Sequence, residues 1–378
     1  MIYLDNAAST RITPEVRAAL LPFLDSEYGN PSSLHAAGRR ARRAMEDARE
    51  TVATCLGGDP KEIVFTSGAT ESNLLAIAGV AEALRPRGDH LITSQIEHPS
   101  VLETVARLER QGWSVTRVPV DEEGLVDERS VSRALTPRTV LISLMKVNNE
   151  IGAVQPVEEL RKAAPGVLIH TDAAQAIGKV PVTIAAVDLL TFSAHKMHGP
   201  KGVGGLWIRK GTPLIPQSLG GGQEFEKRGG TENVAGIVGL AVAMKAARAS
   251  MDREPSRLEA LRAKLKAGLE ALGGARVFGP ESRRSSHILN IAFEGVDGEA
   301  AILSLDAAGV CVSSGSACAS LSRQQSHVHK AMGVPPEISR GSLRYSLSAL
   351  TTEVEIDAAV AASARVVERL RKISTVER

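Results

Sequence analysis

The fold is decided by residues 63–72, which read Ile63-Val64-Phe65-Thr66-Ser67-Gly68-Ala69-Thr70-Glu71-Ser72. The short run of β-branched and aromatic residues predicts a buried strand, and it passes through small polar residues into Thr70 to Leu84, which has helical spacing. Such a strand-to-helix turn presents backbone N–H groups at a positive helix N-terminus, which suits a phosphate or another anion. The alternative is an ordinary helix cap by Thr70 or Ser67, and the pattern alone leaves both open.

The same alternation continues around this stretch. Six further runs predict strands, at His90 to Thr93, Val115 to Val118, Val140 to Leu144, Val167 to His170, Asp188 to Phe192 and Gly205 to Ile208. Helical spacing recurs between or before them, as in Ala36 to Cys55 and Ser100 to Arg110. Alternating strands and helices predict an α/β fold with a mainly parallel, seven-stranded sheet covered by helices.

The pattern changes beyond about residue 250. A charged helical stretch, Arg253 to Leu272, precedes strand-like Ile288 to Phe293, a further helix and Val310 to Ser313. The stretch Thr352 to Lys372 reads as one closing amphipathic helix. We therefore predict a second, smaller α+β domain in this part of the chain.

Composition excludes several classes of function. The 378 residues carry 45 Lys+Arg and 43 Asp+Glu, a net charge of +2. Because positive and negative charges nearly cancel, the protein has no strong electrostatic field to hold nucleic acid or an anionic membrane. We therefore expect no direct binding of either. Three cysteines make no disulfide framework and suit a reducing compartment. The chain opens without a secretory signal, and Val234 to Met244 is shorter than the ~20 apolar residues of a membrane span, so we expect a cytoplasmic protein.

Two more polar clusters follow predicted strands, at the sheet edge where open α/β folds bind ligands. Asp172 is either a helix N-cap or a carboxylate aimed into a site. Lys196 follows the strand that ends at Phe192. A lysine sequestered there would have a lowered pKa and could form a Schiff base, whereas the alternative is a lysine that points out from a loop.

The three clusters together are more specific than any one of them. Pyridoxal phosphate needs a lysine for its aldehyde, a carboxylate beside its ring nitrogen and donors for its phosphate. Lys196, Asp172 and the turn after Phe65 match these needs. We therefore predict a site for pyridoxal 5′-phosphate.

A small polar loop, Ser313-Ser314-Gly315-Ser316-Ala317-Cys318-Ala319-Ser320, surrounds the third cysteine. It has no large apolar side chain to bury Cys318, so we expect an exposed thiol on a flexible loop, as a nucleophile requires. The alternative is an incidental surface cysteine.

These ordered motifs resemble those of the cysteine desulfurases, pyridoxal phosphate enzymes of the class V aminotransferase family with fold type I. The resemblance spans nearly the whole chain and rests on Tyr3-Leu4-Asp5-Asn6-Ala7-Ala8, Gly29-Asn30-Pro31-Ser32-Ser33, the turn at Thr66, Val147-Asn148-Asn149-Glu150-Ile151-Gly152, Asp172-Ala173-Ala174-Gln175, His195-Lys196, Arg228-Gly229-Gly230-Thr231, Ser313 to Cys318, and Thr351-Thr352-Glu353. The expected domains are a large coenzyme-binding domain, 13–252, and a small domain, 1–12 with 253–378, which carries the cysteine loop.

The resemblance implies a role for each site residue. Lys196 would bind the coenzyme covalently and move the substrate's α-proton, Cys318 would attack the substrate's sulfur, and His98 would stack on the coenzyme ring and act as acid or base. Asp172 would pair with the ring nitrogen, and Gln175 would donate to the ring oxygen. The other expected coenzyme contacts are Ala69, Thr70, Asn149, Ser193 and His195, with Thr231 from the other subunit of a homodimer. Asn149 and Arg344 would orient the substrate carboxylate, which a planar guanidinium suits.

The implied reaction converts L-cysteine into L-alanine and leaves sulfur as a persulfide on Cys318, for iron–sulfur cluster assembly or another sulfur-containing product. A sulfur-acceptor protein is the expected partner. His327 and His329 near the cysteine loop are either metal ligands or solvated loop histidines; the pattern favours solvated histidines, so no resident metal is expected. Two alternatives stay open: a selenocysteine lyase or a desulfurase dedicated to DNA or tRNA modification, and a sulfur-relay protein without catalysis.

Overall fold

The computed structural model describes residues 1–315 and 325–376, and for residues 374–376 the backbone only. Within these residues the largest feature is a seven-stranded sheet of β2 (Ile63–Thr66), β3 (His90–Ser94), β4 (Ser114–Val118), β5 (Thr139–Ser143), β6 (Leu168–Asp172), β7 (Leu189–Ser193) and β8 (Gly204–Ile208). Their order is β2-β8-β7-β6-β5-β3-β4. Neighbours from β4 to β7 pair in parallel, and β8 is antiparallel to both β7 and β2. The predicted mainly parallel sheet is confirmed.

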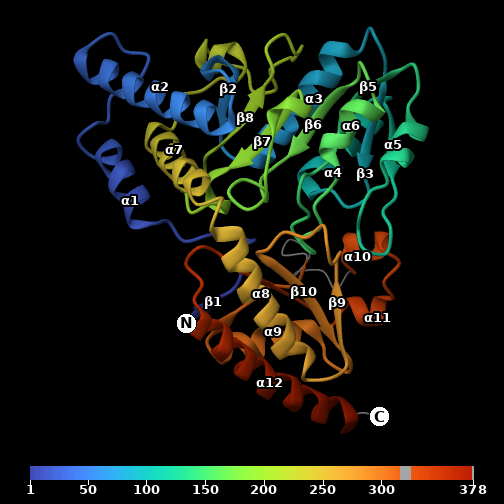
Figure 1. Ribbon diagram of the computed structural model, residues 1–378. Coiled ribbons are helices and arrows are strands. Elements are labelled where there is room, and N and C mark those ends of the chain that lie inside the picture. The colour runs from blue at the N-terminus through green and yellow to red at the C-terminus, as the bar shows by residue number, and fades with distance from the viewer. Residues whose placement is uncertain (316–324, 377–378) are drawn as a thin grey trace.

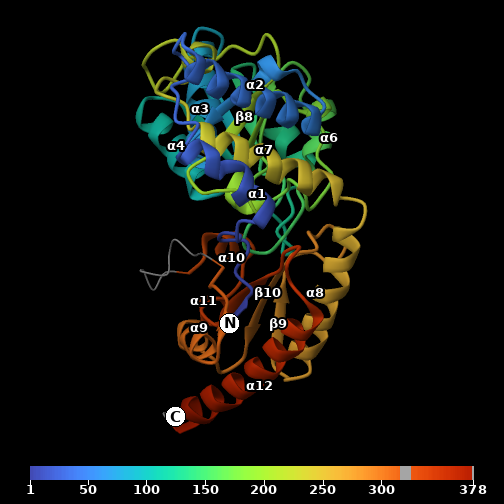
Figure 2. The ribbon, with the colours of Figure 1, turned by 90° about the vertical axis from the view of Figure 1, so that its left-hand side faces the viewer.

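Helices cover both faces of this sheet (Figure 1, Figure 2). Successive side chains of a strand point to opposite faces of the sheet. Because helices cover both faces, a buried strand needs apolar side chains on both of them. Phe65 and Ile142 join the core on the α2 and α7 side, whereas their neighbours Val64 and Leu141 join the core on the α3 and α4 side. The helices of this part are α1 (Pro14–Leu20), α2 (Ala36–Leu56), α3 (Ala69–Leu84), α4 (Pro99–Arg110), α5 (Glu128–Ala134), α6 (Val157–Ala163) and α7 (Val234–Ala249), with 3-10 turns η1 (Leu21–Leu24), η2 (Pro60–Glu62), η3 (Ile184–Ala186), η4 (Ala194–Lys196) and η5 (Gln223–Glu226).

The C-terminal part lies below the large sheet in Figure 1 and has its own antiparallel sheet, β12-β10-β9. Its strands are β9 (Ala275–Phe278), β10 (Ile288–Phe293), β11 (Val310–Cys311) and β12 (Ser342–Ser346), and its helices are α8 (Glu254–Glu270), α9 (Gly298–Ala307), α10 (His327–Ala331), α11 (Pro336–Ser339) and α12 (Glu353–Val376). A separate apolar core joins α8, α9 and α12 to β10 and β12. The predicted elements are present, although β9 and β12 were not predicted. The domain boundaries stay a prediction.

The N-terminal residues connect the two sheets. Strand β1 (Ile2–Tyr3) pairs in parallel with β11, and the Asn6 side chain donates to the Ser346 carbonyl over 2.8 Å. Further on, the Thr10 N–H donates to the His195 carbonyl over 2.8 Å. The start of the chain therefore runs from the small sheet to the end of β7.

A buried ion pair holds the segment that follows β8. Arg49 on α2 donates two hydrogen bonds to Glu224, of 2.8 and 2.7 Å, and both side chains are almost fully buried. The Phe65 N–H donates to the same carboxylate over 2.7 Å. Glu224, Phe225 and Glu226 all have left-handed backbone, with φ of 46°, 58° and 62°, which costs free energy in residues other than glycine. The ion pair fixes this strained turn against α2 and β2.

Within the described part of the chain, no single helix is long and apolar enough to cross a membrane. The bent pair of α7 and α8 meets that test of length and composition only when the two helices are counted together.

Candidate active site

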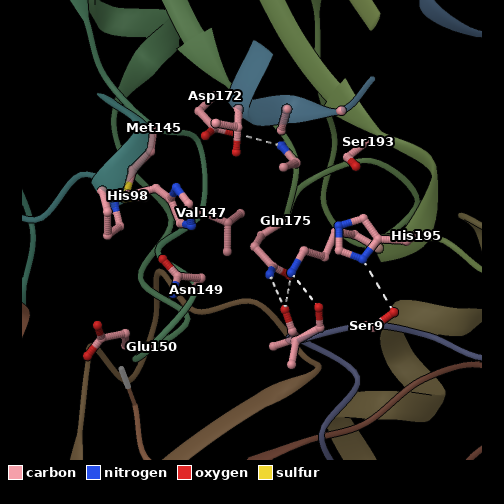
Figure 3. A pocket seen from close by; sticks show the side chains of 18 of the residues that line it. Ser9, His98, Met145, Val147, Asn149, Glu150, Asp172, Gln175, Ser193 and His195 are labelled. Carbon is pink, nitrogen blue, oxygen red and sulfur yellow. Dashed lines mark hydrogen bonds between the residues drawn. The ribbon is translucent and has the colours of Figure 1, made fainter. Parts of the chain in front are cut away.

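A cavity of about 790 Å³ opens where the carboxyl ends of the parallel strands face β12. Its volume suits a small ligand, and this edge is where open α/β sheets bind ligands. Figure 3 shows Asp172, His98, Gln175 and His195 converging on it from different segments. The cavity is lined by ten of the predicted site residues, namely Ala69, Thr70, His98, Asn149, Asp172, Gln175, Ser193, His195, Lys196 and Arg344.

One wall of the cavity is the N-terminus of α3. The helix begins at Ala69, and Gly68 in the N-cap position supplies no capping side chain. The predicted alternative, a cap by Thr70 or Ser67, is therefore wrong. A Cβ at Gly204 would lie 2.8 Å from the Gly68 Cα, so the glycine at 204 allows β8 to pass directly behind the turn. The first N–H groups of α3 have no partner within the helix and can receive an anion.

Lys196 lies on the floor of the cavity, on η4 directly after β7. Its ammonium donates to the carbonyls of Ala7 and Ala8, each over 2.7 Å. The alternative of a lysine pointing out from a loop is therefore wrong. The neighbouring His195 forms a hydrogen bond of 3.3 Å with the Ser9 hydroxyl (Figure 3). Burial, helped by the charge of Lys196, lowers the pKa of His195 to about 4.

Asp172 ends β6 and is buried. One carboxylate oxygen accepts from the Ala174 N–H over 2.9 Å, and the other accepts from the Asn73 side chain over 2.7 Å. Asp172 thus makes a cap-like turn and also faces the cavity, so both predicted alternatives hold in part. The sequence reasoning missed Asn73, although an amide within the apolar helix α3 is a signal, because burying it is costly unless it is bonded.

His98 caps α4 and faces the same cavity. Its Nδ1 accepts from the Ser100 N–H over 3.1 Å, so the proton of the neutral ring is on Nε2. The Ser100 hydroxyl, 2.8 Å from Nδ1, accepts from Asn73 and so links His98 to Asp172. Burial lowers the pKa of His98, with Lys196 acting in the same direction and Asp172 opposing.

Arg344 on β12 forms the opposite wall and is 1% exposed. Its guanidinium donates to the carbonyl of Asn149 over 2.9 Å and to that of Gly315 over 3.3 Å. Its Nε is buried without a hydrogen-bond partner among the described residues. Beside it Glu150, which was missed, accepts a 2.5 Å hydrogen bond from the Ser326 hydroxyl, and burial raises its pKa.

Some predicted residues are not placed at the cavity. Thr231 is exposed and does not line it, and Cys318 lies outside the described residues. His329 is fully buried, bonded to the Ser339 hydroxyl over 3.0 Å and packed on Phe278, so its interpretation as a solvated histidine is wrong. Among the residues described, no three His, Cys, Asp or Glu side chains are grouped to hold a metal ion.

The groups present fit pyridoxal phosphate. A lysine amine, a fixed carboxylate and an open helix N-terminus face one cavity, and the coenzyme has an aldehyde, a basic ring nitrogen and a phosphate to match them. The guanidinium of Arg344 across the cavity suits the carboxylate of an amino acid.

Comparison with known proteins agrees with this geometry. The profile of the class-V aminotransferase family matches residues 2–359. The chain is 47% identical to the cysteine desulfurase IscS of Dictyoglomus turgidum over 378 residues, 99% of this chain and 96% of that protein. A solved NifS-like protein superposes with a TM-score of 0.92 at 40% identity, covering 97% of this chain and 99% of the other. The NifS-like protein of Rickettsia africae gives 0.88 at 30% identity, with the same coverage.

The chain therefore belongs to the class-V aminotransferase family, and within it to the cysteine desulfurases that these relatives represent.

Proposed function

We propose that this protein is a pyridoxal phosphate-dependent enzyme that takes sulfur from L-cysteine, releases L-alanine and holds the sulfur as a persulfide on Cys318. The observation that carries the proposal is the convergence of Lys196, Asp172 and the N-terminus of α3 on one cavity, with Arg344 opposite. The kinship with cysteine desulfurases supports the choice of substrate.

The coenzyme, when bound, withdraws electrons from the Cα of an attached amino acid. The residues of this chain do the rest. Asp172, held by Asn73, favours a proton on the ring nitrogen. Arg344 receives the substrate carboxylate, and Lys196 holds or moves the α-proton. His98, neutral because burial lowers its pKa, is a second group that can accept a proton.

The attack on sulfur is assigned to the Cys318 thiolate. The substrate's C–S bond breaks, the Cys318 S–S bond forms, and the electron pair of the broken bond returns to the substrate carbon skeleton, which leaves as alanine after protonation. A sulfur-acceptor protein then takes the terminal sulfur. The Ser313 to Cys318 motif supports this assignment.

We further propose a homodimer in the cytoplasm. Thr231, which is exposed and outside the cavity of its own chain, is available to the phosphate site of a second copy. Ion pairing of Arg228 with Glu71 over 2.9 Å ties its loop to the first turn of α3.

The test is turnover of L-cysteine by the protein loaded with pyridoxal phosphate, followed as alanine and sulfide. Cys318→Ala should keep the yellow coenzyme and bind cysteine but release no sulfide, whereas Cys311→Ala, the control, should react like wild type. Sulfide release by Cys318→Ala at the wild-type rate would contradict the assignment. Selenocysteine as substrate distinguishes a selenocysteine lyase, which would use it in strong preference to cysteine.

A further inference from the structure

Behind the cavity, the amide of Gln175 is held by three partners. Its nitrogen donates to the Ala7 carbonyl over 2.8 Å. Its oxygen accepts from the Lys179 ammonium over 3.3 Å and lies 3.2 Å from Nε2 of His287. Gln175 and His287 are buried and Lys179 is half-buried, so these contacts compete little with water.

The partners allow one orientation of this amide. The Ala7 carbonyl can only accept. Burial, helped by the charge of Lys196, lowers the pKa of Lys179 to about 7, and below that pH its ammonium can only donate. Burial lowers the pKa of His287 well below its usual value, so its ring is neutral and carries one proton. The Ser285 hydroxyl, 2.5 Å from Nδ1 of His287, can satisfy that nitrogen as donor and leave the proton on Nε2, facing the oxygen of Gln175. A flipped amide would place oxygen against the Ala7 carbonyl and NH₂ against two donors.

The orientation leaves one N–H of Gln175 unused by these bonds, beside Lys196. Both Gln175 and Lys196 donate to the Ala7 carbonyl, which brings their nitrogens to the same acceptor. Lys179 therefore bonds to a side chain that shares a hydrogen-bond acceptor with the reactive lysine. The charged or titratable groups near this cluster are the basic Lys196, Lys201, His195, His198, His287 and Arg344, together with the carboxylate of Asp172, which lines the same cavity.

We propose that Lys179 is a positioning residue: with His287 it fixes the Gln175 amide with an N–H toward the cavity, and its ammonium opposes positive charge on the nitrogen of Lys196. The inference rests on the proposed function, since the N–H of Gln175 would meet the ring oxygen of the coenzyme. Both effects act in one direction. A donor to the ring oxygen and a nearby cation each favour the unprotonated form of the nitrogen that joins Lys196 to the coenzyme.

The test is a pH titration of the visible absorbance of the coenzyme-loaded protein, with no substrate present. In Lys179→Met the absorbance transition should move to higher pH by about one unit, because a cation and a donor are lost while a chain of similar volume stays. Lys179→Arg, which keeps both, should titrate close to wild type. Lys162→Met, a change at an exposed lysine on α6, is the matched control and should leave the transition in place.

The outcomes separate the inference from the function. A wild-type protein that titrates and turns over cysteine, with a Lys179→Met variant that binds coenzyme and titrates at the same pH, would overturn the inference alone. If Lys179→Met does not fold, Lys179→Gln takes its place with the same expectation. A wild-type protein that takes up no coenzyme would overturn both the inference and the proposed function. A purely structural role for Lys179 would lower thermal stability without moving the transition.

Discussion

Arg344 donates a hydrogen bond of 2.9 Å from Nη2 to the carboxylate of Asp5, a residue 339 positions away in the sequence. The bond crosses from β12 to the N-terminal segment, so it closes the wall of the cavity with the two ends of the chain. Because Arg344 is buried and also donates to two backbone carbonyls, those of Asn149 and Gly315, its guanidinium is oriented before any ligand arrives. An incoming carboxylate has to share this guanidinium with Asp5.

Arg344→Lys should weaken substrate binding while leaving the coenzyme in place. Lysine keeps the charge but loses the planar fork that bonds a carboxylate at two points, so we expect KM for cysteine to rise about tenfold or more. Steady-state alanine formation measures KM, and the visible spectrum reports the coenzyme. An unchanged KM would remove Arg344 from the substrate site.

Asp172→Asn should lower kcat about 100-fold or more, because a neutral amide cannot favour a proton on the coenzyme's ring nitrogen. Asn73→Ala, which removes one donor to Asp172 but leaves its charge, should have a smaller effect of about tenfold. Rates of alanine formation at saturating cysteine compare the two variants. An Asp172→Asn protein as active as Asn73→Ala would show that the carboxylate charge is not needed.

Glu97 should make stability depend on pH. Burial raises the pKa of Glu97 to about 8. The Ser94 hydroxyl and the Met145 N–H, which donate to its carboxylate, lower the pKa but do not outweigh burial. The unfolded chain ionises near the usual value for Glu, about 4.3. The contribution of protonated Glu97 to the free energy of unfolding is therefore complete below about pH 4.3. It is lost as the pH rises from there to about 8, and above about pH 8 it changes no further.

Glu97→Gln should therefore lose this pH dependence. Between about pH 5 and about pH 8 the wild type should lose roughly 2 kcal/mol or more relative to the variant, measured by urea unfolding. Glu103→Gln, an exposed change on α4, is the control and should follow the wild type. Parallel curves for wild type and Glu97→Gln would show that Glu97 does not titrate in this range.

Breaking the Arg49–Glu224 pair should destabilise the protein strongly. Glu224→Gln leaves the buried guanidinium with only the half-exposed Glu46 as counter-charge, at a cost of roughly 3–5 kcal/mol in unfolding free energy. Removing both charges, in Arg49→Met with Glu224→Gln, should cost less than the two single changes added together. Glu368→Gln breaks an exposed ion pair with Lys372, which solvent screens, and should leave stability nearly unchanged. Additive effects at 49 and 224 would contradict the coupling.

The sequence predicted the large sheet well because its signals are local. Each buried strand, such as Ile63–Thr66, is a short apolar run, and the helices Ala36–Leu56, Ala69–Leu84 and Pro99–Arg110 begin and end within one residue of the predicted stretches. Strand β12, Ser342–Ser346, was missed because its serines and Arg344 are polar, and they are buried only through contacts with the distant β10 and N-terminal residues.

The sequence predicted those site residues whose own side chains carry the chemistry. It did not predict the backbone carbonyls and neighbouring side chains that hold them in place. Asp172 ends a strand, Lys196 comes shortly after one, and both were found. The carbonyls of Ala7 and Ala8, which receive the lysine ammonium, leave no mark in a pattern of residue types. Lys179 was missed because a lysine in a turn is usually exposed, and its bond to Gln175 depends on the folded position of that turn.

The N-terminal segment has a consequence for the order in which the protein matures. During synthesis on the ribosome, residues 1–10 emerge about 300 residues before β11 and Ser346, which hold them. A nascent chain that has completed the large sheet already has Lys196 and Asp172, yet it still lacks the partners that anchor Ala7 and Ala8 beneath the lysine. The cavity therefore reaches its final form only after β12 has been made, and we expect coenzyme capture to follow that step.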